Sequence, residues 1–205
     1  MAIVGQEIFS TMLDKAERTR KAPAYTKKSL TWFRKKVKSE VGRSGNVNRR
    51  DLMQRTEQLR QHTFIGRMYH FYYDPKLKAQ LPYYDRFPLV FPIEMYSDGF
   101  LGMNLHYLNP RMRAKLMDAL FNTLNSKTMT EKDRLRVSYD LLNGSAQFRF
   151  FKPTVKRYLY GHVRSRFLMI PPEEWQIALF LPSQDFQKST SQQVWKDSRK
   201  IARRG

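Results

Sequence analysis

The sequence contains no cysteine among its 205 residues, which excludes disulfide scaffolds, thiolate zinc sites and cysteine nucleophiles. Acidic side chains are also scarce, since 18 Asp and Glu stand against 38 Lys and Arg, for a formal net charge of +20. A charge of that size indicates a polyanionic partner. Nucleic acid is the first candidate, followed by an anionic membrane or an acidic protein surface.

Long apolar runs are absent as well. The longest, around residues 89–91 and 178–181, are interrupted by proline within a few residues, so neither is expected to span a bilayer. The first residues show no basic stretch followed by an apolar one, so no signal peptide is expected. With 41% hydrophobic and 14% aromatic residues, the chain is too apolar to be wholly disordered. We therefore expect a folded, intracellular, strongly cationic protein.

The charge is distributed unevenly along the chain. Residues 1–62 carry a net +9, residues 63–125 a net +2 and residues 126–205 a net +9. The nearly neutral middle holds 12 of the 25 Phe and Tyr residues, between Phe64 and Tyr107. This pattern predicts a basic helical N-terminal arm (1–62), an α+β core domain (63–182) and a basic C-terminal tail (183–205). The tail is expected to be mobile when unbound, or docked on a partner through Trp195.

Two windows contain no acidic residue at all, 18–39 and 141–172. Like charges repel on a folded surface, so these windows favour a polyanion site over a merely solvated surface. No motif for reading bases accompanies them, which predicts phosphate contacts that are independent of sequence and sensitive to salt. The predicted nucleic-acid-binding residues are Lys27, Lys28, Arg34, Lys35 and Lys38 in the first window, and Arg149, Lys152, Lys156, Arg157, Arg164 and Arg166 in the second.

The core is predicted to be a small SH3-like antiparallel barrel or a curled sheet with flanking helices. Residues rich in β-formers suggest strands near 66–73, 87–93, 100–105 and 164–170, with Ser97-Asp98-Gly99 as a hairpin turn. The two prolines in 87–93 favour an edge strand or a bent one. Asn109-Pro110 opens the clearest helix, and residues 155–160 suggest one or two helical turns. The dense aromatics are expected to form the core, with a base-stacking platform as the alternative.

Catalytic signals are weak. None of the four His residues lies three to five positions from another, so no metal and no cofactor are expected. Asp74-Pro75-Lys76 matches the D-x-K pattern of Mg²⁺ nucleases, but that chemistry needs a second carboxylate, for which Asp85 and Glu94 are the nearby options. No Gly-rich phosphate loop and no Ser/His/Asp order stands out. We therefore expect a protein that is not an enzyme.

Several long strings resemble one known family, the DNA end protector (head-completion) proteins of contractile-tailed phages. The strings cover 66–69, 72–76, 81–89, 99–108, 111–120, 163–167 and 174–182, within a similar region of roughly 64–200. The resemblance implies a virion protein that binds the ends of packaged linear double-stranded DNA and shields them from host exonuclease. It also implies action near the head–tail joint, presence in the host cytoplasm during assembly, and neither catalytic residues nor a cofactor.

A structural role is the alternative reading of the same strings. In that reading the chain is a neck, connector or baseplate protein whose basic segments dock on acidic phage subunits. Its partners would be portal, neck or tail proteins, and association with copies of itself is a further option. No membrane partner is expected under either reading.

Overall fold

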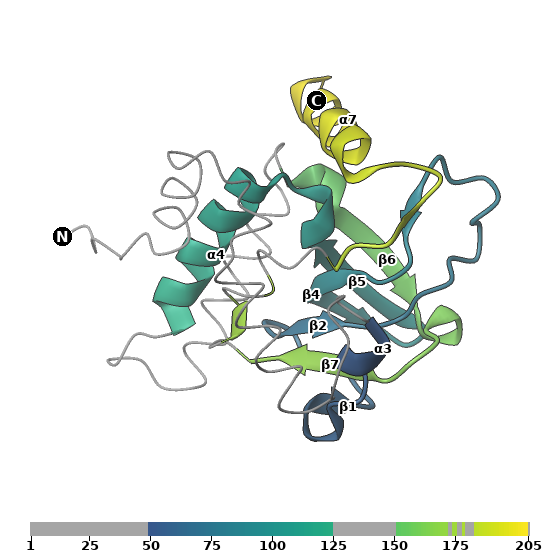
Figure 1. Cartoon of the computed structure of the whole chain (residues 1–205), viewed down its shortest axis with the longest axis vertical. Coiled ribbons are helices and arrows are strands. Elements are labelled where there is room, and N and C mark those ends of the chain that lie inside the picture. The colour runs from purple at the N-terminus through teal and green to yellow at the C-terminus, as the bar shows by residue number, and fades with distance from the viewer. Residues whose placement is uncertain (1–48, 125–150, 172–173, 176–177, 179–182, 205) are drawn as a thin grey trace.

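The computed structural model describes residues 49–124, 151–171, 174–175, 178 and 183–204 (Figure 1). Most of the predicted N-terminal arm therefore lies outside the described residues. The strands are β1 (Leu59–Arg60), β2 (Met68–His70), β3 (Tyr84–Asp85), β4 (Leu89–Tyr96), β5 (Gly99–Asn104), β6 (Val155–Leu159), β7 (Phe167–Ile170) and β8 (Phe186–Gln187). The helices are α3 (Arg49–Leu52), α4 (Pro110–Leu124) and α7 (Ser191–Arg204), with short 3-10 turns η2 (Thr56–Gln58), η3 (Leu105–Tyr107), η4 (Lys152–Thr154) and η5 (Tyr160–His162).

Six strands form one sheet in the order β1-β7-β2-β4-β5-β6, and every neighbouring pair is antiparallel. β3 and β8 form a separate two-stranded ribbon. The α+β class and the antiparallel sheet are thus confirmed. The closed barrel is not formed, because closure requires the first and last strands to pair, whereas β1 and β6 stay at opposite edges of the described sheet.

β4 lies in the middle of this sheet, between β2 and β5, so the prediction of an edge strand is wrong. The alternative of a bent strand agrees with the register shift between Pro92 and Glu94. Pro88 precedes the strand and Pro92 lies beside the irregularity, where a missing N–H disturbs the regular ladder least. The sheet therefore accommodates both prolines without placing this strand at its edge.

The predicted hairpin turn is confirmed, since Tyr96 of β4 pairs with Gly99 of β5 across Ser97 and Asp98. Gly99 also pairs with Leu159 of β6, and a Cβ added to it would lie 2.0 Å from the carbonyl oxygen of Tyr158. Glycine is what lets β6 approach this closely. The helical turns predicted for 155–160 are wrong, because pairing with β5 makes this segment a strand.

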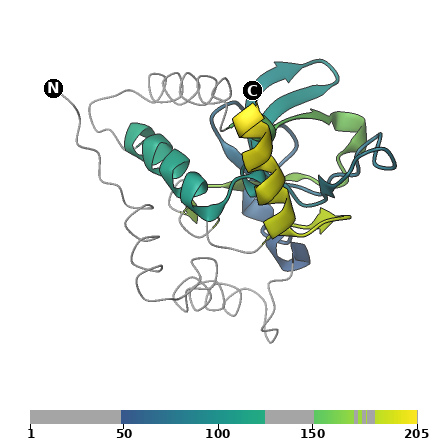
Figure 2. The same ribbon diagram turned by 90° about the horizontal axis from the view of Figure 1, so that it is seen from above.

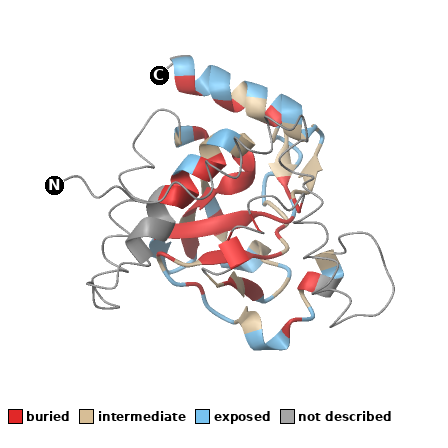
Figure 3. Cartoon of the chain, turned by 60° about the vertical axis from the view of Figure 1, so that its left-hand side comes forward, coloured by how far each residue is buried: buried red, intermediate tan, exposed pale blue. Residues whose placement is uncertain are grey.

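Two apolar clusters fill the two faces of the sheet. Met68, Leu89 and Phe91 belong to the larger cluster, which includes Trp175 and the buried side of α4, while Tyr69 and Val90 belong to the second. The alternation follows from the period of two along a strand. Figure 3 shows the buried residues concentrated on the strands. Most of the aromatics counted in the sequence are therefore core residues, as expected.

α4 begins where the sequence predicts. The side-chain Oδ1 of Asn109 accepts the backbone N–H of Met112 at 3.0 Å, which caps the first turn, and Pro110 opens the helix. Ala114, Leu116 and Met117 are buried in the larger cluster. The local cap and the apolar period together place this helix against the sheet (Figure 1).

The C-terminal segment differs from the predicted mobile or partner-docked tail. It forms α7, whose Val194, Ser198 and Ala202 are buried at i, i+4 and i+8. The indole Nε1–H of Trp195 donates to the backbone oxygen of His106 at 2.8 Å, so this side chain is held by the protein's own core. Seen from above, α7 lies over the strands with α4 to one side (Figure 2). No helix in the described ranges is long and apolar enough to cross a membrane.

Candidate nucleic-acid interface

Five of the predicted DNA-binding residues lie in the described structure. Lys152 is on η4, Lys156 and Arg157 are on β6, and Arg164 and Arg166 lie between η5 and β7. The other six are outside the described residues, namely Arg149, Lys27, Lys28, Arg34, Lys35 and Lys38.

The two β6 cations point to opposite sides of the sheet, as neighbours on a strand do. Lys156 is half-buried with its ammonium 4.4 Å from the centre of the Tyr107 ring, and burial lowers its pKa. Arg157 is exposed, forms an ion pair with Asp98 and lies 4.0 Å from the centre of the Tyr96 ring. Both charges therefore already have partners within the protein.

The remaining three are exposed cations. Lys152 lies on η4, which packs against α7. Arg164 donates to the backbone oxygen of Gly161 at 3.2 Å and lies 4.0 Å from a carboxylate oxygen of Asp74. Arg166 directly precedes Phe167, the residue that pairs with Arg60 of β1. The side chains of all three reach solvent, so they fit phosphate contacts better than the half-buried Lys156 does.

α7 carries the strongest cationic feature of the described residues, and the sequence prediction did not include it. Lys196, Arg199, Lys200 and Arg203 are all exposed, and their spacing of i, i+3, i+4 and i+7 places them on one stripe, which we call the α7 basic stripe. Figure 3 shows the exposed residues on the outer side of this helix. The signal that would have found it is the small or apolar series at 194, 198 and 202, which fixes the opposite face.

Like charges four residues apart on a helix repel, so the pairs 196/200 and 199/203 destabilise α7 by a few tenths of a kcal/mol each. The acidic residue of α7 is Asp197, whose Oδ1 lies 3.9 Å from Lys200 Nζ and accepts from Gln193 Nε2 at 2.9 Å. Asp197 contributes one negative charge to α7, beside the four positive charges of the stripe. A polyanion laid along it would relieve the repulsion.

The second feature of the site region is a group of hydrogen-bonded polar side chains that lie buried inside the fold. Asp85 Oδ2 lies 2.5 Å from His106 Nδ1, and His106 Nε2 lies 3.2 Å from the hydroxyl of Ser183. His70 Nε2 lies 3.4 Å from the same hydroxyl, and its Nδ1–H donates to the backbone oxygen of Pro88 at 3.0 Å. We call Asp85, His106, Ser183 and His70 the buried polar cluster.

The order Asp–His–Ser is that of a hydrolase triad, which no pattern in the sequence indicated. Its setting is structural, however. The Ser183 residue is 0% exposed and His106 is 0% exposed, so a substrate does not reach the hydroxyl. Asp85 also accepts the backbone N–H of Asp185 at 3.0 Å and that of Phe87 at 3.1 Å. The cluster therefore ties the segment leading to α7 onto the sheet.

The protonation of this cluster follows from its burial. Burial alone would raise the pKa of Asp85, but His106 and the N–H groups of Asp185 and Asn104 outweigh it and lower that pKa. Burial lowers the pKa of His70 to about 3, assisted by the neighbouring His106, and burial also lowers the pKa of His106 despite Asp85. Asp85 is therefore ionised and both rings are neutral near pH 7.

The geometry gives no support to a metal nuclease. Asp74 accepts two hydrogen bonds from Lys78 Nζ, at 2.8 and 3.1 Å, and Asp85 is committed to the buried polar cluster. Within the described ranges, no group of three or more His, Asp or Glu side chains is placed to hold a metal ion. Asp74-Pro75-Lys76 is thus explained as part of a surface turn.

The chain matches one family of known proteins. A family model described as phage T4 terminal DNA protecting protein matches residues 6–198. A search of the curated proteins and a search of the solved structures each found no match.

Proposed function

The chain belongs to the phage T4 terminal DNA protecting protein family, and on that premise we propose that it binds the ends of linear double-stranded DNA through phosphate contacts. Contacts of this kind do not read sequence, so any packaged genome end is a substrate. Covering the end keeps host exonucleases from it. The protein would act in the virion near the head–tail joint, where it helps to complete the filled head.

The α7 basic stripe is the observation that carries this proposal. Its four exposed cations lie between residues 196 and 203, seven steps along the helix, or about 10 Å of helix axis at 1.5 Å per step. Duplex DNA presents a charge every 1.7 Å of its axis, so about six phosphate charges lie along a stretch of that length. The stripe therefore matches a short run of duplex backbone in both length and sign.

Lys152, Arg164 and Arg166 extend the cationic surface beyond α7. Lys152 adjoins the helix through η4, whereas Arg164 and Arg166 lie in the segment between η5 and β7. None of these residues lies in a motif that positions a helix or ribbon in a DNA groove. The arrangement supports sequence-independent affinity.

The test is the salt dependence of binding to a short blunt duplex. Replacing Lys196, Arg199, Lys200 and Arg203 with Gln should reduce the slope of log K against log salt by about 3.6, since each lost phosphate contact removes about 0.9. Arg111 and Lys115 on α4 are also exposed, and the double Gln variant there is the matched control. It should leave the slope within experimental error of the parent protein.

An unchanged slope in the α7 variant would remove α7 from the DNA interface. Weak DNA binding together with stable co-purification of a ring-shaped phage component would instead favour a connector role, in which α7 docks on an acidic portal, neck or tail subunit. Both experiments use the full chain.

A further inference from the structure

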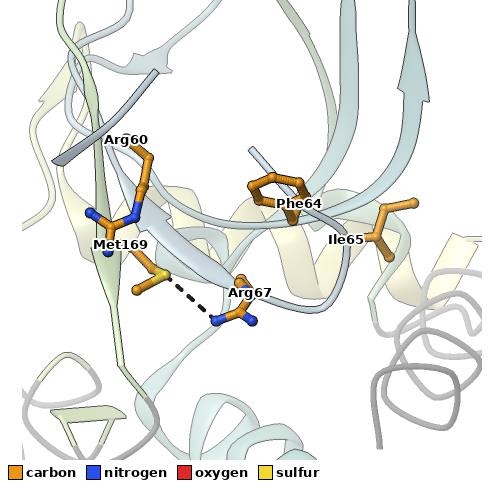
Figure 4. A pocket seen from close by; sticks show the side chains of 5 residues that line it. All are labelled: Arg60, Phe64, Ile65, Arg67 and Met169. Atoms are coloured by element: carbon orange, nitrogen blue, oxygen red, sulfur yellow. Dashed lines mark hydrogen bonds between the residues drawn. The ribbon is translucent and has the colours of Figure 1, made fainter. Parts of the chain in front are cut away.

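One pocket lies on the far side of the molecule from α7. It is lined by Arg60, Phe64, Ile65, Arg67 and Met169 and has a volume of about 440 Å³. Figure 4 shows the two guanidinium groups and the Phe64 ring around this space. The volume falls within the range of about 300–1,000 Å³ that is usual for small-ligand sites, and it suits a group the size of one nucleotide.

Phe64 is the unusual residue in this pocket. The residue is 60% exposed, the highest value among the exposed large apolar residues of the described chain. An exposed aromatic side chain beside a pocket marks a binding site more often than an isolated exposed aliphatic side chain does. The other aromatics of this stretch are largely inside the core, so Phe64 departs from the pattern of its own neighbourhood.

The turn that holds Phe64 is fixed rather than loose. The backbone N–H of Phe64 donates to the hydroxyl of Tyr69 at 3.1 Å, and Tyr69 is buried in the second apolar cluster. Thr63 is buried, and Gly66 adopts a positive φ of 79°, a conformation that suits glycine. The ring is thus presented to solvent by an anchored backbone, which lowers the entropy lost when a ligand stacks on it.

Two arginines give this pocket its charged groups. Among the described residues that line it, the two ionisable ones, Arg60 and Arg67, are both cationic. Arg60 donates to the backbone oxygens of Glu57 at 2.7 Å and Leu59 at 3.0 Å, which orient the guanidinium without neutralising it. Arg67 Nη1 lies 3.8 Å from the sulfur of Met169. Two guanidinium groups that line the same pocket are a favourable phosphate site, since each can donate two parallel hydrogen bonds.

We propose that this pocket takes the terminal nucleotide of a DNA strand, with Phe64 stacked on its base and Arg60 and Arg67 bound to its phosphate. An aromatic face beside paired arginines matches the two parts of a nucleotide, and an exposed base face exists only where a duplex ends. This inference rests on the proposed function and deepens it, because phosphate contacts alone do not distinguish an end from the middle of a duplex.

The pocket and the α7 basic stripe can be tested independently. α7 and β1 lie at opposite ends of the molecule in Figure 1, and Arg60 is a residue of β1. Arg166 lies next to the pocket along the sheet, since Phe167 pairs with Arg60. Pocket variants should therefore change the preference for ends, whereas α7 variants change the salt slope on any DNA.

The experiment compares two duplexes of equal length and sequence, one with open blunt ends and one closed at both ends by hairpin loops. The parent protein should bind the open duplex more tightly. Phe64→Ala should reduce that ratio by about fivefold or more, the loss expected for one base–aromatic stack, while binding to the closed duplex stays unchanged. Arg60→Gln combined with Arg67→Gln should lower the ratio in the same way. This double variant should also bind 5′-phosphorylated and 5′-hydroxyl open duplexes with equal affinity.

Leu77→Ala is the matched control for Phe64→Ala, because Leu77 is 55% exposed and lies outside the pocket. An open-to-closed ratio above one that survives all pocket substitutions would overturn the nucleotide site and leave the proposed function standing. A ratio of one in the parent protein would overturn end binding itself. Since Phe64 is exposed, unchanged circular dichroism and melting temperature are expected for its variant and verify that it folds.

Discussion

Acidification should destabilise the protein through His70. Its pKa falls from 6.5 in the unfolded chain to about 3 in the fold, so below pH 6.5 the unfolded state binds a proton that the folded state does not. Stability contributed by the neutral ring is therefore complete above pH 6.5 and is lost progressively as the pH falls toward 3. Each pH unit costs about 1.36 kcal/mol, which gives about 2.7 kcal/mol at pH 4.5. His106 acts in the same direction, since burial lowers its pKa as well.

Urea unfolding at several pH values between 7 and 4.5, followed by circular dichroism, measures this loss. His70→Phe keeps a ring stacked on Phe87, whose centroid lies 4.7 Å from that of His70, and removes the titrating group. The variant should be less stable at pH 7, because Pro88 loses its donor, but its pH dependence should be flatter by about 1.4 kcal/mol per unit. The exposed Leu77 provides a control for substitution as such, and Leu77→Ala should leave the slope unchanged because it removes no titrating group. An equal slope in His70→Phe and the parent protein would refute the account of a neutral buried ring.

Three further substitutions test the packing. Ser183→Ala removes the hydroxyl that faces both imidazole rings and should cost about 1–3 kcal/mol of unfolding free energy in urea, with no loss if the hydroxyl is dispensable. Glu174→Gln breaks the buried 2.8 Å ion pair with Arg55 and should cost about 3–5 kcal/mol of unfolding free energy. The double variant Arg55→Met/Glu174→Leu should be more stable than Glu174→Gln, and a double variant that is no more stable would contradict this reasoning. Gly99→Ala should lower the melting temperature markedly, because the added Cβ meets the Tyr158 backbone; a neutral result would show that β6 can move away.

The elements predicted well from sequence are those decided by nearby residues. Asn109 and Pro110 specify the start of α4 locally, and Ser97-Asp98 specify the hairpin. The strand β6 was missed because its strand conformation depends on pairing with β5, more than fifty residues earlier in the chain. Likewise, the central position of β4 depends on where β2 lies, which no local pattern specifies.

In the candidate site, too, features set by nearby residues could be predicted, whereas contacts between distant residues could not. The acid-free window grouped Lys152, Lys156, Arg164 and Arg166 together as predicted phosphate contacts. It could not show that Lys156 would lie against the Tyr107 ring while the other three reach solvent. The buried polar cluster joins residues that are 21 and 77 positions apart, a juxtaposition that sequence spacing does not reveal. Phe64 counted as one more core aromatic in the sequence, because composition says nothing of which ring faces solvent.

Protection of DNA ends is the central claim, and exonuclease digestion tests it most directly. Linear duplex DNA and a nicked circle of the same sequence are each mixed with the full-length protein at physiological salt. An exonuclease that enters at open ends and one that enters at nicks are then added, each to its own substrate. We predict that the linear DNA survives, while the nicked circle is degraded nearly as fast as without the protein. Equal survival of both substrates, or rapid loss of the linear DNA, would contradict the account.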